Sequence, residues 1–182
     1  MSILKIARMG HPVLRRRADE IPDPTAPEIR KLAADMIETM ADAPGVGLAA
    51  PQVHVPVRLV VFRPPTPPEE EDALLTILIN PVLEALGEDM GEDWEGCLSV
   101  PGLRGLVPRH NRLRYHGADL NGESIERTVE GFHARVVQHE CDHLDGILYP
   151  QRMNELSNLI FDSEMRHVFS AECSQKEAEE QI

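Results

Sequence analysis

The segment GFHARVVQHECDHLD, residues 131–145, contributes most to both the fold and the chemistry of this 182-residue chain. Its spacing predicts a helix with apolar residues on more than one side. These are Phe132 and Val136 on one side, and Val137, Cys141 and Leu144 on another. A helix of this kind must be buried, so we expect β-sheets to surround it. Gly146 suits its carboxyl end.

Two histidines on this helix indicate a metal site. His139 and His143 are one turn apart on the same face, so both imidazoles can bind one ion. Glu140 lies beside the open side of that ion, where a carboxylate acts as a base. The pattern is typical of metal-dependent hydrolases. A catalytic site of this kind needs three protein ligands and one position for water, so a third ligand must come from elsewhere.

The third ligand has downstream and upstream candidates. Tyr149 stands where metzincin proteases have their third histidine, while Glu155 and Glu164 are nominal candidates of the thermolysin type without a supporting motif. Upstream, Cys97 lies in the segment WEGCLSVP, residues 94–101. The glycine before Cys97 lets the backbone approach an ion, and a metal-bound thiolate loses its proton. The alternative is that Cys97 is simply a small buried residue.

A glycine-containing segment, PGVGLAAPQ at residues 44–52, suggests a chain packed tightly against a neighbour. Its small residues leave backbone groups exposed, and Gln52 ends it with an amide that can donate hydrogen bonds. The segment lacks the Gly-Lys-Ser/Thr ending of a P-loop and the spacing of a dinucleotide fingerprint. Nucleotide binding is therefore not expected.

Together, these three segments closely resemble the peptide deformylase family. The motifs of that family are intact here at residues 45–52, 95–99 and 139–143, in the same order. The resemblance extends from residue 5 through about residue 149. It implies a hydrolase that removes the formyl group from the N-terminal formylmethionine of newly synthesised polypeptides and releases formate.

The resemblance also implies a ligand set. Cys97, His139 and His143 would hold one divalent ion in a tetrahedral site whose fourth ligand is water. The family implies ferrous iron as the working ion. Zinc, cobalt or nickel also suit a cysteine with two histidines, because geometry rather than the ligand list selects among these metals.

Three further residues are implied to carry the reaction. Glu140 would take the proton of the water and give it to the departing amine. The side-chain amide of Gln52 and the backbone N–H of Leu98 would stabilise the oxyanion that develops on the formyl carbonyl.

The substrate would bind through five other positions. Val46, Phe132 and Val136 match a pocket for the methionine side chain. Gly47 would bond the peptide backbone, and Arg104 would orient the chain beyond the first residue. Taken without the resemblance, the three apolar residues suit ordinary core packing and Arg104 suits a solvated surface charge.

Two other classes of protein remain open at this point. A metalloprotease would use the same helix but would depend on a downstream carboxylate and tolerate the loss of Cys97. A structural metal-binding protein would close the site with a fourth protein ligand. Asp142 is also open, since it could brace a ligand imidazole or pair within the helix.

Composition and charge indicate one cytoplasmic enzyme. No apolar run approaches the roughly 20 residues of a membrane span, no signal peptide is expected at the amino terminus, and the three cysteines do not suggest a disulfide framework. The net charge of −13 disfavours direct nucleic-acid binding. Residues 154–182 carry seven acidic residues against Arg166 and Lys176, so we expect only weak contact with the ribosome.

The remaining pattern predicts one α+β domain over residues 1–182, with antiparallel or mixed β-sheets packed around the buried helix and a C-terminal helix. Thr25 to Glu28 resembles a capping box that begins a helix through about Met40. Strands are expected at residues 57–62, 74–79 and 82–86, and a hairpin at residues 113–120 and 124–129. A final helix is expected at residues 154–169, a stiff proline-rich acidic loop at residues 64–72 and a frayed acidic tail at residues 170–182.

Overall fold

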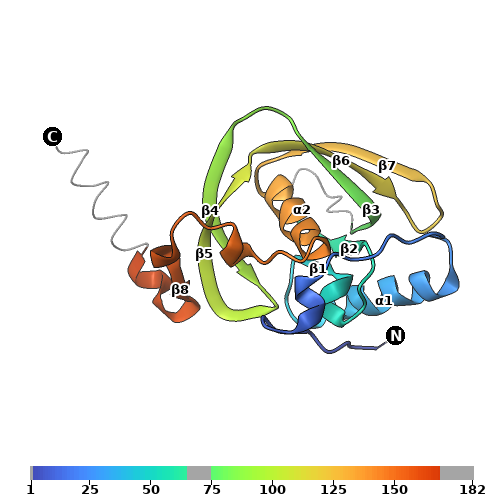
Figure 1. Ribbon diagram of the computed structural model, residues 1–182, viewed down its shortest axis with the longest axis horizontal. Helices are drawn as coiled ribbons and strands as arrows, with labels where there is room; N and C mark the ends of the chain where they lie inside the picture. The colour runs from blue at the N-terminus through green and yellow to red at the C-terminus, as the bar shows by residue number, and fades with distance from the viewer. Residues whose placement is uncertain (1, 65–74, 169–182) are drawn as a thin grey trace.

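The computed structural model describes residues 2–64 and 75–168. Most of the expected proline-rich loop and the expected tail at residues 170–182 therefore lie outside the described residues. Within the described ranges, the strands form two antiparallel sheets, and helix α2 (Gly131–Leu144) lies between them (Figure 1). This arrangement confirms the expected α+β fold.

The larger sheet has the spatial order β1-β2-β3-β6-β7. Its strands are β1 (Gly47–Ala49), β2 (Leu59–Phe62), β3 (Thr76–Ala85), β6 (Arg112–Ala118) and β7 (Ser124–Glu130). The smaller sheet has the order β4-β5-β8, with β4 (Met90–Cys97), β5 (Val100–His110) and β8 (Leu159–Phe161). Short 3-10 helices occur at Pro12–Arg15, Ala50–Val53, Tyr149–Gln151, Leu156–Asn158 and Asp162–Glu164.

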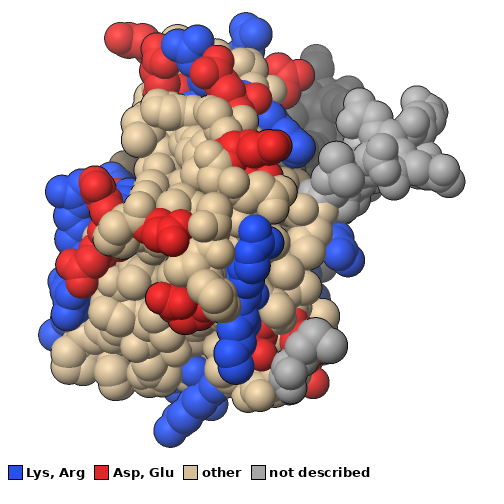
Figure 2. Space-filling model, turned by 90° about the vertical axis from the view of Figure 1, so that its right-hand side faces the viewer, with Lys and Arg blue, Asp and Glu red and all other residues tan. Residues whose placement is uncertain are grey.

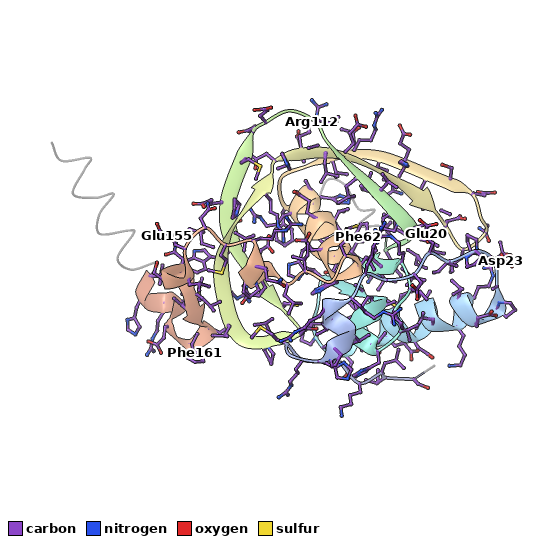
Figure 3. All side chains as sticks on the ribbon, in the orientation of Figure 1. Glu20, Asp23, Phe62, Arg112, Glu155 and Phe161 are labelled. Carbon is purple, nitrogen blue, oxygen red and sulfur yellow. The ribbon has the colours of Figure 1, made fainter. Side chains whose placement is uncertain are left out.

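Helix α2 is buried as its sequence pattern predicts. Val137, Cys141 and Leu144 belong to an apolar cluster that also contains Phe62 and Leu78 from the larger sheet. In Figure 3, Phe62 lies near the centre of the molecule. Phe132, by contrast, is 46% exposed, because the face it occupies borders a cavity rather than the core.

The helix ends because the chain must turn closely past the amino-terminal segment. Gly146 has φ +75°, a conformation that favours glycine, and a Cβ there would lie 2.8 Å from the backbone carbonyl carbon of Arg15. The carbonyl of Leu144 accepts a hydrogen bond from the backbone N–H of Ala18. The amino-terminal segment therefore covers the end of α2.

Helix α1 (Pro27–Asp42) forms at the predicted place, but not by the predicted cap. Ala26 occupies the N-cap position with no side-chain hydrogen bond, and Pro27 begins the helix. The hydroxyl of Thr25 donates to Asp23 instead, so the expected capping box is wrong. The buried face of α1 includes Ile29, which packs in the second apolar cluster beside β1 and β2.

Five strands differ from the prediction, since β1, β4, β5 and β8 were not predicted and β3 joins two expected strands. The expected strands at residues 74–79 and 82–86 form one strand, β3, with an irregular register between Ile79 and Val82. Asn80, at φ +50°, sits at this irregularity, and its amide exchanges two hydrogen bonds with the backbone of Ile21. Strand β5 was not predicted, because its sequence contains two prolines, two glycines and two arginines. Its pairing with β4 and β8 supplies the hydrogen bonds that local propensity does not indicate.

The expected hairpin forms between β6 and β7. The carboxylate of Asp119 accepts hydrogen bonds from the backbone N–H groups of Asn121 and Glu123, which closes the turn. The final helix begins only at Met165, not at residue 154. Upstream of it, β8 pairs with β5, and Leu156, which falls within the expected helix, is 70% exposed.

The surface in Figure 2 carries acidic and basic side chains intermingled with uncharged residues. The net charge of −13 is therefore not gathered into one continuous acidic surface on this face. Among residues 2–64 and 75–168, no helix combines the length and apolar character needed to cross a bilayer.

Replacing Leu78 by alanine should remove about 2–5 kcal/mol from the free energy of unfolding, because this fully buried side chain leaves a cavity beside α2. Leu156→Ala is the matched control: its side chain is 70% exposed, and its loss should change that free energy by about 0.5 kcal/mol or less. Urea unfolding of both variants measures the difference. Equal losses in the two variants would contradict this description of the core.

Candidate metal centre

Helix α2 and strand β4 bring together three side chains that could hold a metal ion. Cys97 is the last residue of β4, and His139 and His143 are one turn apart on α2. Their ligand atoms all lie within 4.8 Å of one another, and Cys97 Sγ lies 3.3 Å from His143 Nε2. A tetrahedral ion with bonds of about 2.0–2.3 Å separates neighbouring ligand atoms by roughly 3.3–3.6 Å. The three side chains therefore fit one divalent ion.

The electrostatics of the cluster also suit a cation. Burial alone would raise the pKa of the Cys97 thiol, but the neighbouring His143 and His139 hold that pKa well below its usual value. Burial opposes the charging of His139, yet its hydrogen bonds to Cys97 and Glu95 raise its pKa well above the usual value. Both shifts favour the charged form of the group concerned, the thiolate of Cys97 and the imidazolium of His139. A metal ion that replaces the proton between them can bind the thiolate of Cys97 and the imidazole of His139.

The other described cysteine has a different environment. Cys141 is 5% exposed among apolar residues, and burial raises the pKa of its thiol strongly. It lies two residues from His139 and faces the core instead of the metal centre. Cys141 therefore remains a protonated, structural thiol.

A buried carboxylate orients one of the two imidazoles. Nδ1 of His139 lies 2.8 Å from Oε2 of Glu95. Burial opposes ionisation of Glu95, but hydrogen bonds from His139 and Arg109 lower its pKa to about 2. Since this carboxylate is ionised, Nδ1 carries the proton and Nε2 is left to bind a metal. Nδ1 of His143 is buried without a hydrogen-bond partner in the described part of the chain.

Two arginines fix Glu95 in turn. Arg109 donates from Nε to Oε1 at 2.9 Å and from Nη2 to Oε2 at 3.0 Å, and Arg135 donates from Nη1 to Oε1 at 2.9 Å. Neither arginine was predicted from the sequence, and Glu95 entered the prediction only as part of a motif. The position of Glu95 within that motif was the only sequence feature that could have indicated its supporting role. No sequence pattern marks Arg109 or Arg135.

Asp142 takes neither of the two roles left open for it, because its carboxylate pairs with arginines outside the helix. Its carboxylate accepts from Arg109 at 2.6 Å and from Arg152 at 2.7 Å. It contacts neither imidazole through these bonds. The carboxylate that braces a histidine is that of Glu95 on β4, which lies 2.8 Å from Nδ1 of His139.

Glu140 lies beside the ligands in a low-dielectric environment. Its side chain is 4% exposed, burial raises its pKa to about 7, and Oε2 has no hydrogen-bond partner among the described residues. A carboxylate with a pKa near the working pH is suited to both accept and donate a proton. Gly47 lies against the side chain of Glu140, and a Cβ at that position would overlap the carboxylate at Oε1.

Gln52 presents its amide nitrogen to the same site. The backbone N–H of Ala49 donates to Oε1 of Gln52 at 2.8 Å, which sets the orientation of the side chain. Nε2 then lies 3.1 Å from Ser99 Oγ and 3.5 Å from Cys97 Sγ. Leu98, between Cys97 and Ser99 in the chain, borders a cavity in front of these groups.

The cavity in front of these groups has a volume of about 450 Å³. All five predicted substrate-binding residues line it: Val46, Gly47, Arg104, Phe132 and Val136. Val46 and Phe132 are 42% and 46% exposed, so ordinary core packing does not describe them, whereas Val136 is 4% exposed and also belongs to the core. A larger cavity of about 720 Å³ lies elsewhere and includes none of the three metal-binding side chains.

Arg104 differs from a free surface charge. Its Nε donates to Asp162 at 2.7 Å, and both side chains are about half-exposed at the border of the cavity.

The downstream carboxylates that a protease would use stand apart from Cys97, His139 and His143. Among the described residues, the group of side chains able to share one ion contains Cys97, His139 and His143, without Glu155 or Glu164.

Comparison with known proteins agrees with this geometry. The family model for polypeptide deformylase matches residues 3–159. The chain belongs to the polypeptide deformylase family. Peptide deformylase 1 of Nitrosomonas europaea is 55% identical over 157 residues, which cover 85% of this chain and 89% of the relative. Peptide deformylase 1 of Bordetella pertussis is 56% identical over 155 residues, covering 84% and 88%.

Solved structures of deformylases share the fold. A class I type b peptide deformylase from Acinetobacter baumannii, bound to Met-Ala-Ser, superposes with a TM-score of 0.77 at 36% identity, covering 84% of this chain and all of that one. The peptide deformylase of Thermotoga maritima gives a TM-score of 0.78 at 34% identity and covers 85% of this chain. As a deformylase, the protein is a metal-dependent hydrolase that removes the formyl group from an N-terminal formylmethionine and releases formate.

Gly47→Ala should lower kcat for deformylation about 10²-fold, because the added methyl group must displace the Glu140 carboxylate. Gly45→Ala is the comparison: its nearest neighbour would be Leu98 Cδ1 at 3.0 Å, the movable end of a side chain, and its effect should be much smaller. Formate release from formyl-Met-Ala-Ser measures both variants. Equal activities would show that the contact between Gly47 and Glu140 does not limit the reaction.

Proposed function

We propose that Cys97, His139 and His143 hold a single divalent ion and that Glu140 moves the proton during deformylation. The observation that carries this proposal is the meeting of four groups: three ligand atoms lie within 4.8 Å of one another, and a buried carboxylate with an unpartnered oxygen lies beside them. Cys97, His139 and Glu140 also line the cavity. When bound, the ion supplies Lewis acidity that lowers the pKa of water to about 7 and polarises a carbonyl.

Glu140 performs the proton transfers. Its pKa of about 7, raised by burial, lets it take a proton from the attacking water and later give that proton to the departing amine. The proton therefore moves from water to Glu140 to the new amino terminus, and the formyl carbon leaves as formate. General acid and base catalysis of this kind contributes typically about 10²- to 10⁴-fold to the rate.

Gln52 and Leu98 stabilise the oxyanion on the formyl carbonyl. The amide oxygen of Gln52 is occupied by the backbone N–H of Ala49, so Nε2 is the end that faces the reacting carbonyl. The backbone N–H of Leu98, next to Cys97, is the second donor. A donor aimed in advance at the developing charge is worth about 2.7–4 kcal/mol of barrier.

The cavity orients the peptide. Val46, Phe132 and Val136 provide an apolar surface for the methionine side chain. The backbone of Gly47 bonds the peptide backbone and holds it beside Glu140. Arg104, positioned by Asp162 at the border of the cavity, orients the residues that follow methionine.

The metal in the cell is proposed to be ferrous iron. One thiolate with two imidazoles accepts iron, zinc, cobalt or nickel, so the ligand set by itself does not choose among them. The structure of the site supports one ion with three protein ligands and an open position, which is the arrangement of a catalytic centre.

Formate release from formyl-Met-Ala-Ser tests these assignments. Protein loaded anaerobically with ferrous iron should be more active than protein loaded with zinc. Cys97→Ala should lose bound metal and activity, Glu140→Ala should keep its metal and lose about 10²- to 10⁴-fold in kcat, and Gln52→Leu should lose about 10²- to 10³-fold. A folded Cys97→Ala variant with parental metal content and activity would reject the ligand set.

The partners are proposed to be nascent polypeptides with N-terminal formylmethionine in the cytoplasm, without direct binding to nucleic acid. Contact with the ribosome should be weak, because seven acidic residues against two basic ones in residues 154–182 oppose phosphate-rich surfaces. Co-sedimentation of the full chain with ribosomes measures this contact. Tight, salt-sensitive binding that requires residues 154–182 would contradict it.

A further inference from the structure

Arg135 makes an unusual set of contacts beside the metal centre. It lies one turn before His139 on α2 and is 7% exposed. Nη1 donates to Glu95 Oε1 at 2.9 Å and to the carbonyl of Val107 at 2.7 Å, and Nη2 donates to the carbonyl of Gly91 at 2.7 Å. The buried guanidinium of Arg135 therefore donates its hydrogen bonds to one carboxylate and to backbone carbonyl oxygens.

These acceptors all belong to the smaller sheet. Gly91 and Glu95 lie on β4, and Val107 lies on β5, whereas Arg135 itself lies on α2. The proposed metal ligands are divided in the same way, with Cys97 at the end of β4 and two histidines on α2. The site is complete only when the helix and the strand hold one relative position, and Arg135 joins them directly.

The contacts of Glu95 give Arg135 a second effect. Oε2 of Glu95 holds His139, and Oε1 is held by both Arg109 and Arg135. Arg109 bonds both oxygens of Glu95 and one of Asp142, but it lies on β5, so Arg135 and His139 are the partners that tie Glu95 to the helix. The donor from Arg135 fixes the carboxylate from the side of the helix that carries His139.

We propose that Arg135 is a positioning residue of the metal centre, which holds the Glu95 carboxylate against His139 and keeps the end of β4 in register with α2. It acts through Glu95 and not on the substrate. A fork of donors is required, because a single ammonium group cannot reach the carboxylate and the carbonyls of two strands together. This inference concerns the ligand geometry and rests on the proposed ligand set.

Arg135→Lys tests the proposal through metal release. Cobalt-loaded protein is mixed with an excess of chelator, and the dissociation rate and the visible spectrum of the bound cobalt are recorded. Because partners of a metal ligand typically change metal affinity about 10- to 100-fold, we expect dissociation about 10- to 100-fold faster and an altered spectrum. The rate of deformylation should also be lower in Arg135→Lys than in the parent.

Arg58→Lys is the matched control. Arg58 is 8% exposed and also holds α2, through Asp145 at 2.8 Å and the carbonyl of Leu144 at 3.4 Å, but it does not contact Glu95 in these bonds. Its replacement should lower thermal stability while leaving the cobalt spectrum and dissociation rate within about twofold of the parent. In a Glu95→Gln background, Arg135→Lys should add less than about a further twofold, since both changes interrupt the same connection.

Each outcome decides the question. A folded Arg135→Lys protein that releases cobalt at the parental rate overturns the proposal. The proposal is also overturned if Arg135→Lys speeds cobalt dissociation as much in the Glu95→Gln background as in the parent, because Arg135 would then act by a route other than Glu95. Arg135→Gln replaces the lysine variant if circular dichroism shows that the latter is unfolded. If neither variant folds while Arg58→Lys does, Arg135 is a folding determinant and the proposal is rejected. Cys97→Ala tests the ligand set separately from the role of Arg135. If Cys97→Ala still binds cobalt as the parent does, the proposed ligand set is wrong.

Discussion

The carboxylate of Glu95 is the point at which the helix and the smaller sheet are joined. Its two oxygens accept from Arg109 on β5 and from Arg135 and His139 on α2, all at 3.0 Å or less. These groups are largely desolvated, so the carboxylate is stable as an anion only because its partners surround it. Removing one member of such a group leaves an uncompensated buried charge, which typically costs about 3–5 kcal/mol.

The apolar core and this ionic group perform different tasks. Packing of α2 against the larger sheet, with Phe62 and Leu78 fully buried, supplies a large non-directional driving force for burying the helix. Such packing tolerates small slips. Hydrogen bonds to a planar guanidinium do not, because both distance and angle must be satisfied. On this account, apolar burial brings the elements together and the polar contacts set the register of the metal centre.

Two glutamates near the ligands illustrate how environment assigns chemistry. Glu95 receives donors from three cationic or imidazole groups, and its pKa is lowered to about 2. Glu140, with one oxygen unpartnered and a similar degree of burial, has its pKa raised to about 7. The first therefore stays an anion that orients its neighbours. The second can change its protonation state near neutral pH, which is what a proton-transfer group needs.

The sequence by itself determined the buried helix, the candidate metal-binding residues on it and the family, because these depend on the spacing of residues along one element. His139 and His143 share a face by helical geometry alone. Cys97 and Gln52 were found through motifs of a few adjacent residues. The hairpin of β6 and β7 was equally local, since the carboxylate of Asp119 closes the short turn that it begins.

Only the tertiary structure decided which residues support that helix. Arg109 and Arg135 reach Glu95 from positions 14 and 40 residues away in the chain, and no local pattern indicates such a meeting. Strand β5 forms because it pairs with β4 on one side and with β8 on the other, although its prolines, glycines and arginines do not favour a strand. Long-range hydrogen bonds and burial outweigh local propensity there, and the metal centre owes its geometry to them.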